Sequence, residues 1–329
     1  MNSFGHSFRI TLTGESHGPM VGIVIDGHPA GIAFSPADFL PDLRRRQPGV
    51  SGTTARREKV QPLIRSGLYQ GRTTGAPLTI EFKNQNHRPD DYAGFRCTPR
   101  PGHADWTAGE KYGGFNDPRG GGRFSGRLTA GLVAAGVVAK KIIHPVKLSA
   151  EIMEAGGFQD IKKAVQEAEN KQDSVGGLIE CRGTRIPPGL GEPFFDSMES
   201  QLSHLIFSIP GIKGIEFGSG FQCCRMRGST CNDPILDKNG RTGSNHSGGI
   251  NGGISSGNEL VFRVAVKPTP SISRPQKTIH INTGKTETLS IPGRHDTCIA
   301  LRMPVIVEAA AAIVLADFSL RKTKVYGRS

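Results

Sequence analysis

Two long segments of this chain are apolar on every side when they are read as helices, and they constrain the fold more than any other feature. They span residues 125–143 and 299–320. A helix without a polar face must be buried, so other elements have to cover both segments. Since predicted strands lie in both halves of the chain, we expect an α+β fold in which a helical layer lies between sheets, a three-layer β-α-β sandwich.

The remaining secondary structure follows from alternation and capping signals, although periodicity does not determine strand order. A helix is predicted to begin at Ser35-Pro36 and to end near Arg46, and two amphipathic helices are predicted at residues 158–172 and 196–208. Residues 84–123 are predicted to form a long functional loop. We find no linker and expect one domain over residues 1–329. The predicted strands are residues 4–13, 21–25, 63–69, 78–83, 147–152, 175–186, 212–217, 259–267 and 277–281.

The net charge of +12 raises the question of a nucleic-acid partner. The arginines are not gathered in one basic helix or tail, and many stand singly beside glycines. This distribution favours a concave site for a small polyanion, so we expect no nucleic acid. A basic nucleic-acid-binding protein stays an alternative, in which moderate salt would abolish most binding.

Cysteine spacing and hydropathy indicate the compartment. None of the six cysteines forms the C-x-x-C pattern of zinc or thioredoxin sites, so we expect no metal and the free thiols of a cytoplasmic protein. Arg9 and Glu15 interrupt any apolar run typical of a signal peptide. Residues 303–318 contain Glu308 and Asp317 and are short for a membrane span, so we expect no membrane partner.

Polar residues flanked by glycine recur at four distant places. These are residues 14–18 (GESHG), 100–105 (RPGHAD), 120–127 (GGGRFSGR) and 294–298 (RHDTC). Glycine permits positive φ and close approach of a ligand, while Arg, His, Ser and Asp bind anions and move protons. Together the four segments predict one composite site.

The GGGRFSGR segment is predicted to open a helix whose N-terminus binds an anion, with Arg123 and Arg127 on one face. The alternative is an N-cap by Ser125 with solvated arginines. His17 and His103 are candidates for acid–base chemistry near neutral pH, the alternative being structural loop histidines. Residues 267–271 (KPTPS) follow a strand and are similar to a backbone cradle, although an ordinary Pro-rich turn is equally consistent. Dinucleotide and Walker fingerprints are missing.

Seven motifs, in order, resemble the chorismate synthase family over residues 4–321: GESHGPMVGIVIDGHPAG, RPGHAD, GGGRFSGR, GLGEPFFD, NHSGGINGGISSG, KPTPS and RHDTC. The resemblance implies antiparallel sheets and a lyase of the shikimate pathway. Such an enzyme converts 5-enolpyruvylshikimate 3-phosphate to chorismate by anti 1,4-elimination of phosphate. It requires reduced FMN without net redox change, and the family is homotetrameric.

The same resemblance assigns roles to residues. His17 is implied as an acid near the leaving phosphate, His103 as the partner of the flavin ring, and Asp296 as a proton relay. The implied substrate contacts are Ser16, Arg46, Arg100, Arg127 and Arg294. The implied cofactor contacts are Arg123, Phe124, Ser125, Gly252, Lys267, Pro268, Thr269, Pro270, Ser271 and Arg294.

The chain also departs from the family pattern. Phe124 replaces a serine, Gly126 an alanine and Leu128 a glutamate, and the loop at residues 49–54 is shortened. A catalytically dead relative is therefore an alternative. Some NADP assignments in the family fall on Arg46, and an added NADPH-dependent flavin reductase activity is another alternative. Because no specific nicotinamide motif is present, we expect an external flavin reductase.

Overall fold

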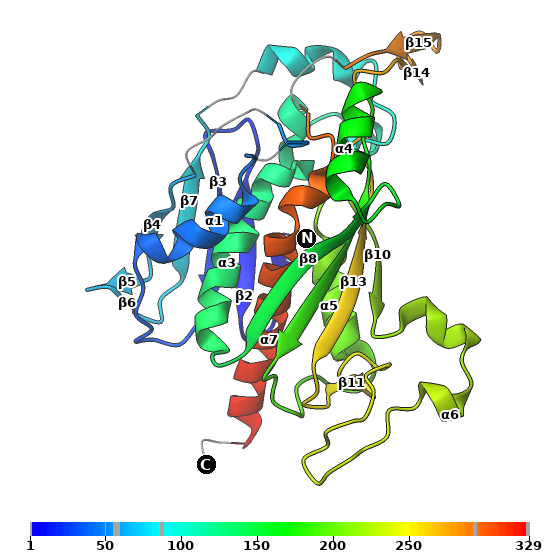
Figure 1. The fold of residues 1–329 in the computed structure, drawn as a ribbon. Helices are drawn as coiled ribbons and strands as arrows, with labels where there is room; N and C mark the ends of the chain where they lie inside the picture. The colour runs from blue at the N-terminus through cyan, green and yellow to red at the C-terminus, as the bar shows by residue number, and fades with distance from the viewer. Residues whose placement is uncertain (1, 50, 55–59, 86–88, 292–294, 327–329) are drawn as a thin grey trace.

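Two antiparallel sheets enclose a layer of helices in the computed structural model, which describes residues 2–49, 51–54, 60–85, 89–291 and 295–326 (Figure 1). The predicted three-layer sandwich is confirmed. The first sheet has the order β1-β2-β3-β7-β4: Ser3–Phe4, Arg9–Gly14, Met20–Asp26, Leu78–Lys83 and Leu63–Ser66. The second has the order β10-β13-β9-β8: Ile212–Phe217, Leu260–Val266, Gly177–Thr184 and Lys147–Ala155.

The two apolar segments form the centre of the helical layer. Helix α3 (Thr129–Ile142) packs on β3 and helix α7 (Pro304–Tyr326) on β8. They pack against each other so closely that a Cβ at Gly136 would lie 2.3 Å from Ala309 Cβ. Both segments begin with a short 3-10 turn, η4 (Gly126–Leu128) and η7 (Ile299–Arg302), and α7 then starts at Pro304, a residue suited to the first helical position because it needs no N–H partner there. Both helices begin at the end of the sandwich that carries β14 and β15 (Figure 1).

The other helices lie around this pair. Turn η1 (Pro36–Phe39) and helix α1 (Leu40–Arg46) form the predicted helix at Ser35-Pro36, and α1 packs on α3. The predicted amphipathic helices are α4 (Ile161–Asn170) and α5 (Met198–Phe207). Glycines interrupt two predicted strands. Gly5 has φ +94° between β1 and β2, and Gly67 has φ +82° between β4 and β5 (Leu68–Tyr69), which pairs with β6 (Arg72–Thr73).

The prediction of one long loop at residues 84–123 is wrong. The segment contains η2 (Pro89–Arg96), α2 (Asp105–Tyr112) and η3 (Arg119–Phe124). Helix α2 has Asp105 in its first turn and ends at Gly113 in the left-handed conformation. These pieces are too short to show an apolar period, so the many glycines and prolines dominated the prediction.

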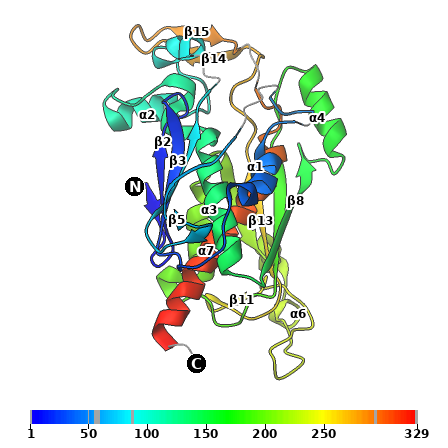
Figure 2. The same ribbon diagram turned by 90° about the vertical axis from the view of Figure 1, so that its left-hand side faces the viewer.

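The two ends of the sandwich differ. Helices α2 and α4 and the hairpin β14 (Gln276–Ile279) and β15 (Thr286–Leu289) lie at one end (Figure 2). Helix α6 (Gly228–Cys231) and the hairpin β11 (Ile250–Asn251) and β12 (Ile254–Ser255) lie at the other (Figures 1 and 2). Two 3-10 turns, η5 (Phe194–Asp196) and η6 (Gly220–Arg225), complete the second half. Among the described helices, none is both long and apolar enough to cross a membrane.

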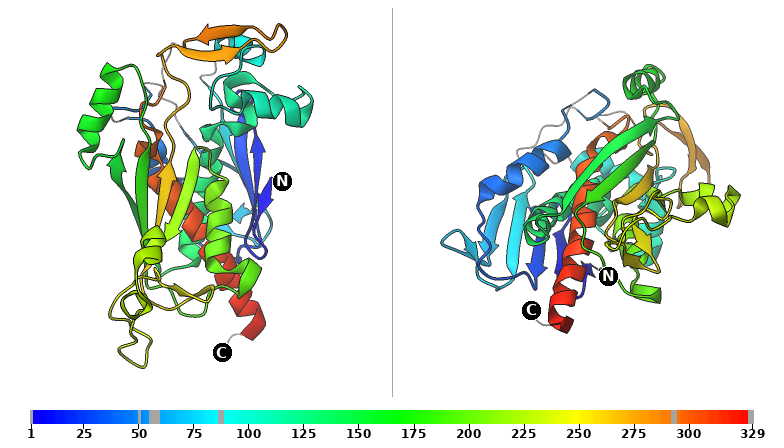
Figure 3. Two further views of the ribbon diagram at one scale, coloured as in Figure 1. Left: turned by 90° about the vertical axis from the view of Figure 1, so that its right-hand side faces the viewer. Right: turned by 60° about the horizontal axis from the view of Figure 1, so that its bottom comes forward.

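Buried carboxylates on α7 tie the layers together. Asp317 accepts hydrogen bonds from the backbone N–H groups of His6, Ser7 and Phe8, so the chain near the N-terminus is fastened to the last helix. Glu308 accepts from Arg45 on α1, from Lys140 on α3 and from the backbone N–H of Ala150 on β8. Figure 3 shows α7, in orange and red, between the two sheets.

Candidate active site

A turn of three glycines separates the two candidate histidines. Gly120, Gly121 and Gly122 have φ of +59°, +82° and +48°, values that a side chain disfavours. A Cβ at Gly120 would lie 2.0 Å from His17 Nδ1, and a Cβ at Gly121 would lie 3.4 Å from His103 Nε2. The glycines therefore allow the two imidazoles, which are 86 residues apart in the sequence, to approach the same turn from two loops.

The Ser16-His17 loop is anchored to this turn. Ser16 N–H donates to the carbonyl of Gly122 (3.2 Å) and Ser16 Oγ to that of Gly120 (3.1 Å), with Oγ 3.1 Å from His17 Nδ1. The His17 ring is buried and stacks edge-on against Tyr92, with 5.0 Å between ring centroids. Contacts within the protein therefore fix the positions of Ser16 and His17.

The prediction that Arg123 and Arg127 share a helix face is wrong. Ser125 lies between them in extended conformation (ψ 141°), and its Oγ accepts from Arg127 N–H as the N-cap of η4. Arg123 therefore turns toward the first sheet and donates to the carbonyls of Leu12 and Gly14.

Arg127 and Arg46, unlike Arg123, connect the start of α3 to other parts of the chain. Arg127 donates to Asn84 Oδ1 (3.1 Å), and Asn84 in turn donates to the carbonyls of Glu15 and Gly18. Arg46 is buried and donates to Thr129 Oγ1 (2.8 Å) and to the carbonyl of Gly126 (2.8 Å). The start of α3 is therefore bonded both to the GESHG loop and to α1.

Asp105 orients His103 and pairs with buried Arg100. Asp105 lies 2.6 Å from His103 Nδ1 and accepts two 2.8 Å hydrogen bonds from Arg100. Burial raises the pKa of Asp105, but the hydrogen bonds from Arg100 and His103 outweigh it and hold the pKa well below its usual value. Nδ1 of His103 faces both this carboxylate and Arg100 Nη2 (3.0 Å), so Asp105 and Arg100 together occupy that side of the ring. His103 Nε2 is then the atom available to a ligand.

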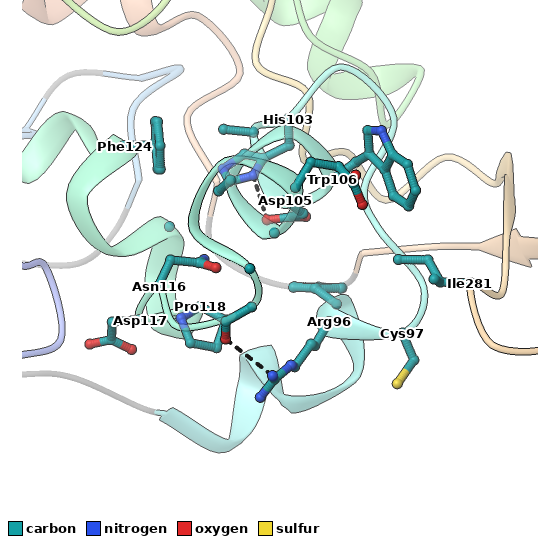
Figure 4. Close-up of a pocket in the computed structure, with 18 of the residues that line it drawn as sticks. Arg96, Cys97, His103, Asp105, Trp106, Asn116, Asp117, Pro118, Phe124 and Ile281 are labelled. Atoms are coloured by element: carbon teal, nitrogen blue, oxygen red, sulfur yellow. Dashed lines mark hydrogen bonds and ion pairs between the residues drawn. The ribbon is translucent and has the colours of Figure 1, made fainter.

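A pocket of about 420 Å³ borders this group (Figure 4). His103 and Asp105 lie side by side in its wall, and Phe124 and Trp106 lie at opposite sides in this view. The hairpin loop of β14 and β15 contributes Ile281. The volume of the pocket, its flat aromatic walls and its histidine suit a ligand with a planar ring system. Phe124 is more than one-third exposed, so its ring is free to contact such a ligand.

The KPTPS segment lines a second, more open hollow of about 310 Å³ beside Gly102. Lys267 Nζ donates to the Gly102 carbonyl (2.6 Å), and burial, helped by Lys213, lowers the pKa of Lys267. Arg100 donates to Ser271 Oγ (3.2 Å). Thr269 Oγ1 is buried and has no hydrogen-bond partner within the described ranges. A buried hydroxyl of this kind fits a ligand group, so these residues fit the flavin that the resemblance implies.

Asp296 is held at the start of η7. Its Oδ1 accepts from Thr54 N–H (2.8 Å) and its Oδ2 from Arg302 Nη1 (3.0 Å). The neighbouring His295 has a buried Nε2 that lacks a partner in the part of the chain that the structure describes. Burial and then the charge of Arg100 lower the pKa of His295, so this imidazole is neutral at pH 7. Arg294 lies outside the described residues.

Among the described cofactor residues, Gly252 is the one that the structure does not bring to this group. It has φ +61° and lies in the turn between β11 and β12, at the end of the molecule opposite α2 and the β14–β15 hairpin (Figure 1). Among the described residues, no three His, Cys, Asp or Glu side chains are arranged to hold a metal ion.

The family model described as chorismate synthase matches residues 8–320 of this chain. The chain belongs to the chorismate synthase family. The chorismate synthase of Chitinophaga pinensis is 57% identical over 321 residues, covering 97% of each chain, and that of Dehalococcoides mccartyi is 46% identical over 352 residues with the same coverage. A solved chorismate synthase structure aligns with a TM-score of 0.75 at 27% identity, covering 97% of this chain and 93% of that one.

The structure also adds residues that motif reasoning did not single out. Asp105 stands in the RPGHAD motif, but nothing local indicates that it pairs with both Arg100 and His103. Asn84 and Arg302 stand outside the predicted set, and their contacts reveal them. A signal that could have indicated Arg302 is a lone arginine in the otherwise apolar turn before α7.

Proposed function

We propose that this member of the chorismate synthase family converts 5-enolpyruvylshikimate 3-phosphate to chorismate and phosphate, with reduced FMN bound. Family membership makes the chain a carbon–oxygen lyase of the shikimate pathway. The observation that carries the proposal is the glycine turn, where His17 adjoins Gly120 and His103 adjoins Gly121. The imidazoles of His17 and His103 therefore belong to one site and can both act in one reaction.

The residues of this chain have separable tasks in this proposal. His17, held beside Ser16, donates a proton to the leaving phosphate. Arg46, Arg100 and Arg127 bind the phosphate and the two carboxylates of the substrate. Asp296 relays the proton removed at C6.

The flavin is held, in the same proposal, by the KPTPS segment, by Phe124 and Ser125, and by Arg123 and Arg294. Bound reduced FMN supplies electron density to the substrate as phosphate leaves, without net redox change. His103, whose Nδ1 lies 2.6 Å from Asp105, presents Nε2 to the flavin ring in this proposal. We propose that a separate reductase reduces the flavin. We also propose a cytoplasmic enzyme, which agrees with its six free cysteines.

We propose a homotetramer, as the family resemblance implies, and the surface chemistry of the chain supports contact between copies. Phe194 and Phe195 are 86% and 93% exposed, and φ of Phe194 is +61°, a strained value for an aromatic residue. They lie next to the turn of Gly252, because Met198 N–H, just after them, donates to the Gly253 carbonyl (2.8 Å). Exposed aromatic pairs are typical of interfaces. A second copy seated on this surface would allow Gly252 to reach a cofactor in that copy.

The decisive experiment is anaerobic turnover of 5-enolpyruvylshikimate 3-phosphate with chemically reduced FMN, following chorismate and phosphate together. We expect equal amounts of both products, none with oxidised FMN, and a large loss of turnover in His103→Ala. A folded protein that binds FMN and releases neither product would contradict the proposal and favour a catalytically dead relative.

A further inference from the structure

Arg302 joins two candidate site residues that are far apart in the sequence. Its Nε donates to the carbonyl of Arg46 (2.9 Å), 256 positions away, and its Nη1 donates to Asp296 Oδ2 (3.0 Å). We propose that Arg302 is a positioning residue of the reaction, which holds the Asp296 carboxylate and the turn of Arg46 in one arrangement. The inference rests on the proposed function, in which Asp296 relays a proton and Arg46 binds the substrate.

The carboxylate of Asp296 is clamped from two sides. Arg302 holds Oδ2, and Thr54 N–H holds Oδ1 at 2.8 Å. Packing also fixes the segment that carries Thr54. Cys298 N–H donates to the Gly52 carbonyl (3.1 Å), and a Cβ at Gly52 would lie 2.4 Å from Val165 Cγ1. A carboxylate with both oxygens bonded to fixed donors has one orientation, which proton transfer at a defined distance requires.

The other bond of Arg302 fixes the end of α1. The carbonyl of Arg46 belongs to the last turn of that helix, where carbonyls lack helical partners. Arg302 satisfies this carbonyl, while the Arg46 side chain reaches the start of α3 through Thr129. One guanidinium therefore connects the starts of η7 and α3 through the end of α1.

The geometry requires arginine. A planar guanidinium presents N–H groups in fixed, divergent directions, so Nε and Nη1 can meet a carbonyl and a carboxylate together. A lysine ammonium on a flexible stem keeps the charge but not this fixed fork. The side chain of Arg302 is about one-fifth exposed, so a small cation from solvent can enter if the side chain is removed.

Kinetics of Arg302→Ala and Arg302→Lys test the proposal, with Arg65→Ala as the matched control because Arg65 pairs with Glu81 on an exposed sheet edge. We expect kcat to fall about 100-fold in Arg302→Ala with KM changed much less, and guanidinium ion to restore part of kcat in that variant alone. Combined with Asp296→Asn, the change should cost little beyond Asp296→Asn itself. A folded Arg302→Ala with kcat within about two-fold of wild type, or full additivity with Asp296→Asn, would overturn the proposal.

Amide hydrogen exchange supplies a readout that does not depend on turnover. Arg302→Ala should speed amide exchange in the peptide that contains Thr54, because Asp296 then loses one of the two groups that bind its carboxylate. Arg65→Ala should leave that exchange unchanged. Unchanged exchange in Arg302→Ala overturns the proposed role. A wild-type protein without turnover would contradict the proposed function instead, and the exchange result would still decide whether Arg302 holds this group.

Discussion

At the scale of single residues, the geometry of the candidate site depends on glycines, because the absence of a side chain leaves room for a neighbouring ring. The His17 ring lies where a Cβ of Gly120 would stand, and the backbone there has φ +59°. Two residues away, the carbonyl of Gly122 accepts from Ser16 N–H. Glycine therefore sets the distance between the GESHG loop and the GGGRFSGR segment.

Gly120→Ala should separate these two loops. The added methyl group would collide with the His17 ring, so we expect kcat/KM to fall about 100-fold. Gly126→Ala is the matched control from the same motif, since a Cβ there meets nothing within 4 Å, and it should stay within about two-fold of wild type. Steady-state kinetics of both variants decide the point, and equal activity would show that His17 tolerates displacement.

Asp105→Asn should damage both chemistry and stability. The amide removes the negative charge that lies 2.6 Å from His103 Nδ1, so turnover should fall roughly 100-fold or more. Arg100, buried at 5% exposure, would lose its anionic partner, at a cost of about 3 kcal/mol in the free energy of unfolding. Asp237→Asn, which breaks an exposed pair with Arg241, should leave the free energy of unfolding nearly unchanged, because solvent screens such a pair. Urea unfolding and kinetics measure both effects, and wild-type values for Asp105→Asn would refute them.

At the scale of elements, α7 packs on the second sheet, α1 and α3, and its Asp317 holds the segment between β1 and β2 of the first sheet. Its Glu308 is buried and bonded to three other elements. Burial raises the pKa of Glu308, but the hydrogen bonds from Arg45 and the charges of Lys140 and Arg45 outweigh it, so the pKa lies below its usual value. The ionised carboxylate is thus part of how the layers are joined.

Glu308→Gln should therefore change the pH dependence of stability. A depressed carboxyl pKa contributes stability above the unfolded value, about 4.3, and loses it as the pH falls through the folded value. The variant should be about 3 kcal/mol less stable than wild type at pH 7, and the difference should shrink as the pH is lowered toward 3. Urea unfolding at several pH values measures this. A constant difference would contradict it, and Glu167→Gln, exposed on α4, is the control.

At the scale of the whole molecule, the described chain carries most of the predicted site at one end and Gly252 at the other (Figures 1 and 2). The exposed Phe194 and Phe195 adjoin the Gly252 turn. Both observations support assembly of several copies, in which apolar surface of one copy is covered by another.

Replacing both Phe194 and Phe195 by serine should weaken that assembly. Burial of two phenyl rings contributes about 3–6 kcal/mol, so we expect the mass measured by light scattering to fall below that of wild type at micromolar concentration. Tyr69→Ser removes an exposed aromatic from β5 and is the control. If the double variant keeps the wild-type mass, the interface lies elsewhere.

Local sequence patterns were sufficient to predict the buried helices and where the polar residues gather. The apolar periodicity at residues 125–143 and 299–320 predicted two buried helices and hence the sandwich, because burial of a helix depends on its own side chains. The glycine-flanked motifs predicted where the polar groups gather, because positive φ is a property of single residues.

Tertiary structure alone decided which of these groups meet. Arg46 and Arg302 are 256 positions apart, and Ser16 and Gly120 are 104 apart. Such contacts depend on strand order and on how helices pack, which no local period encodes. The orientation of Arg123 away from Arg127 follows from one extended residue, Ser125. The sequence thus determined the elements and the chemistry available, and the packing of the layers determined the geometry in which that chemistry is arranged.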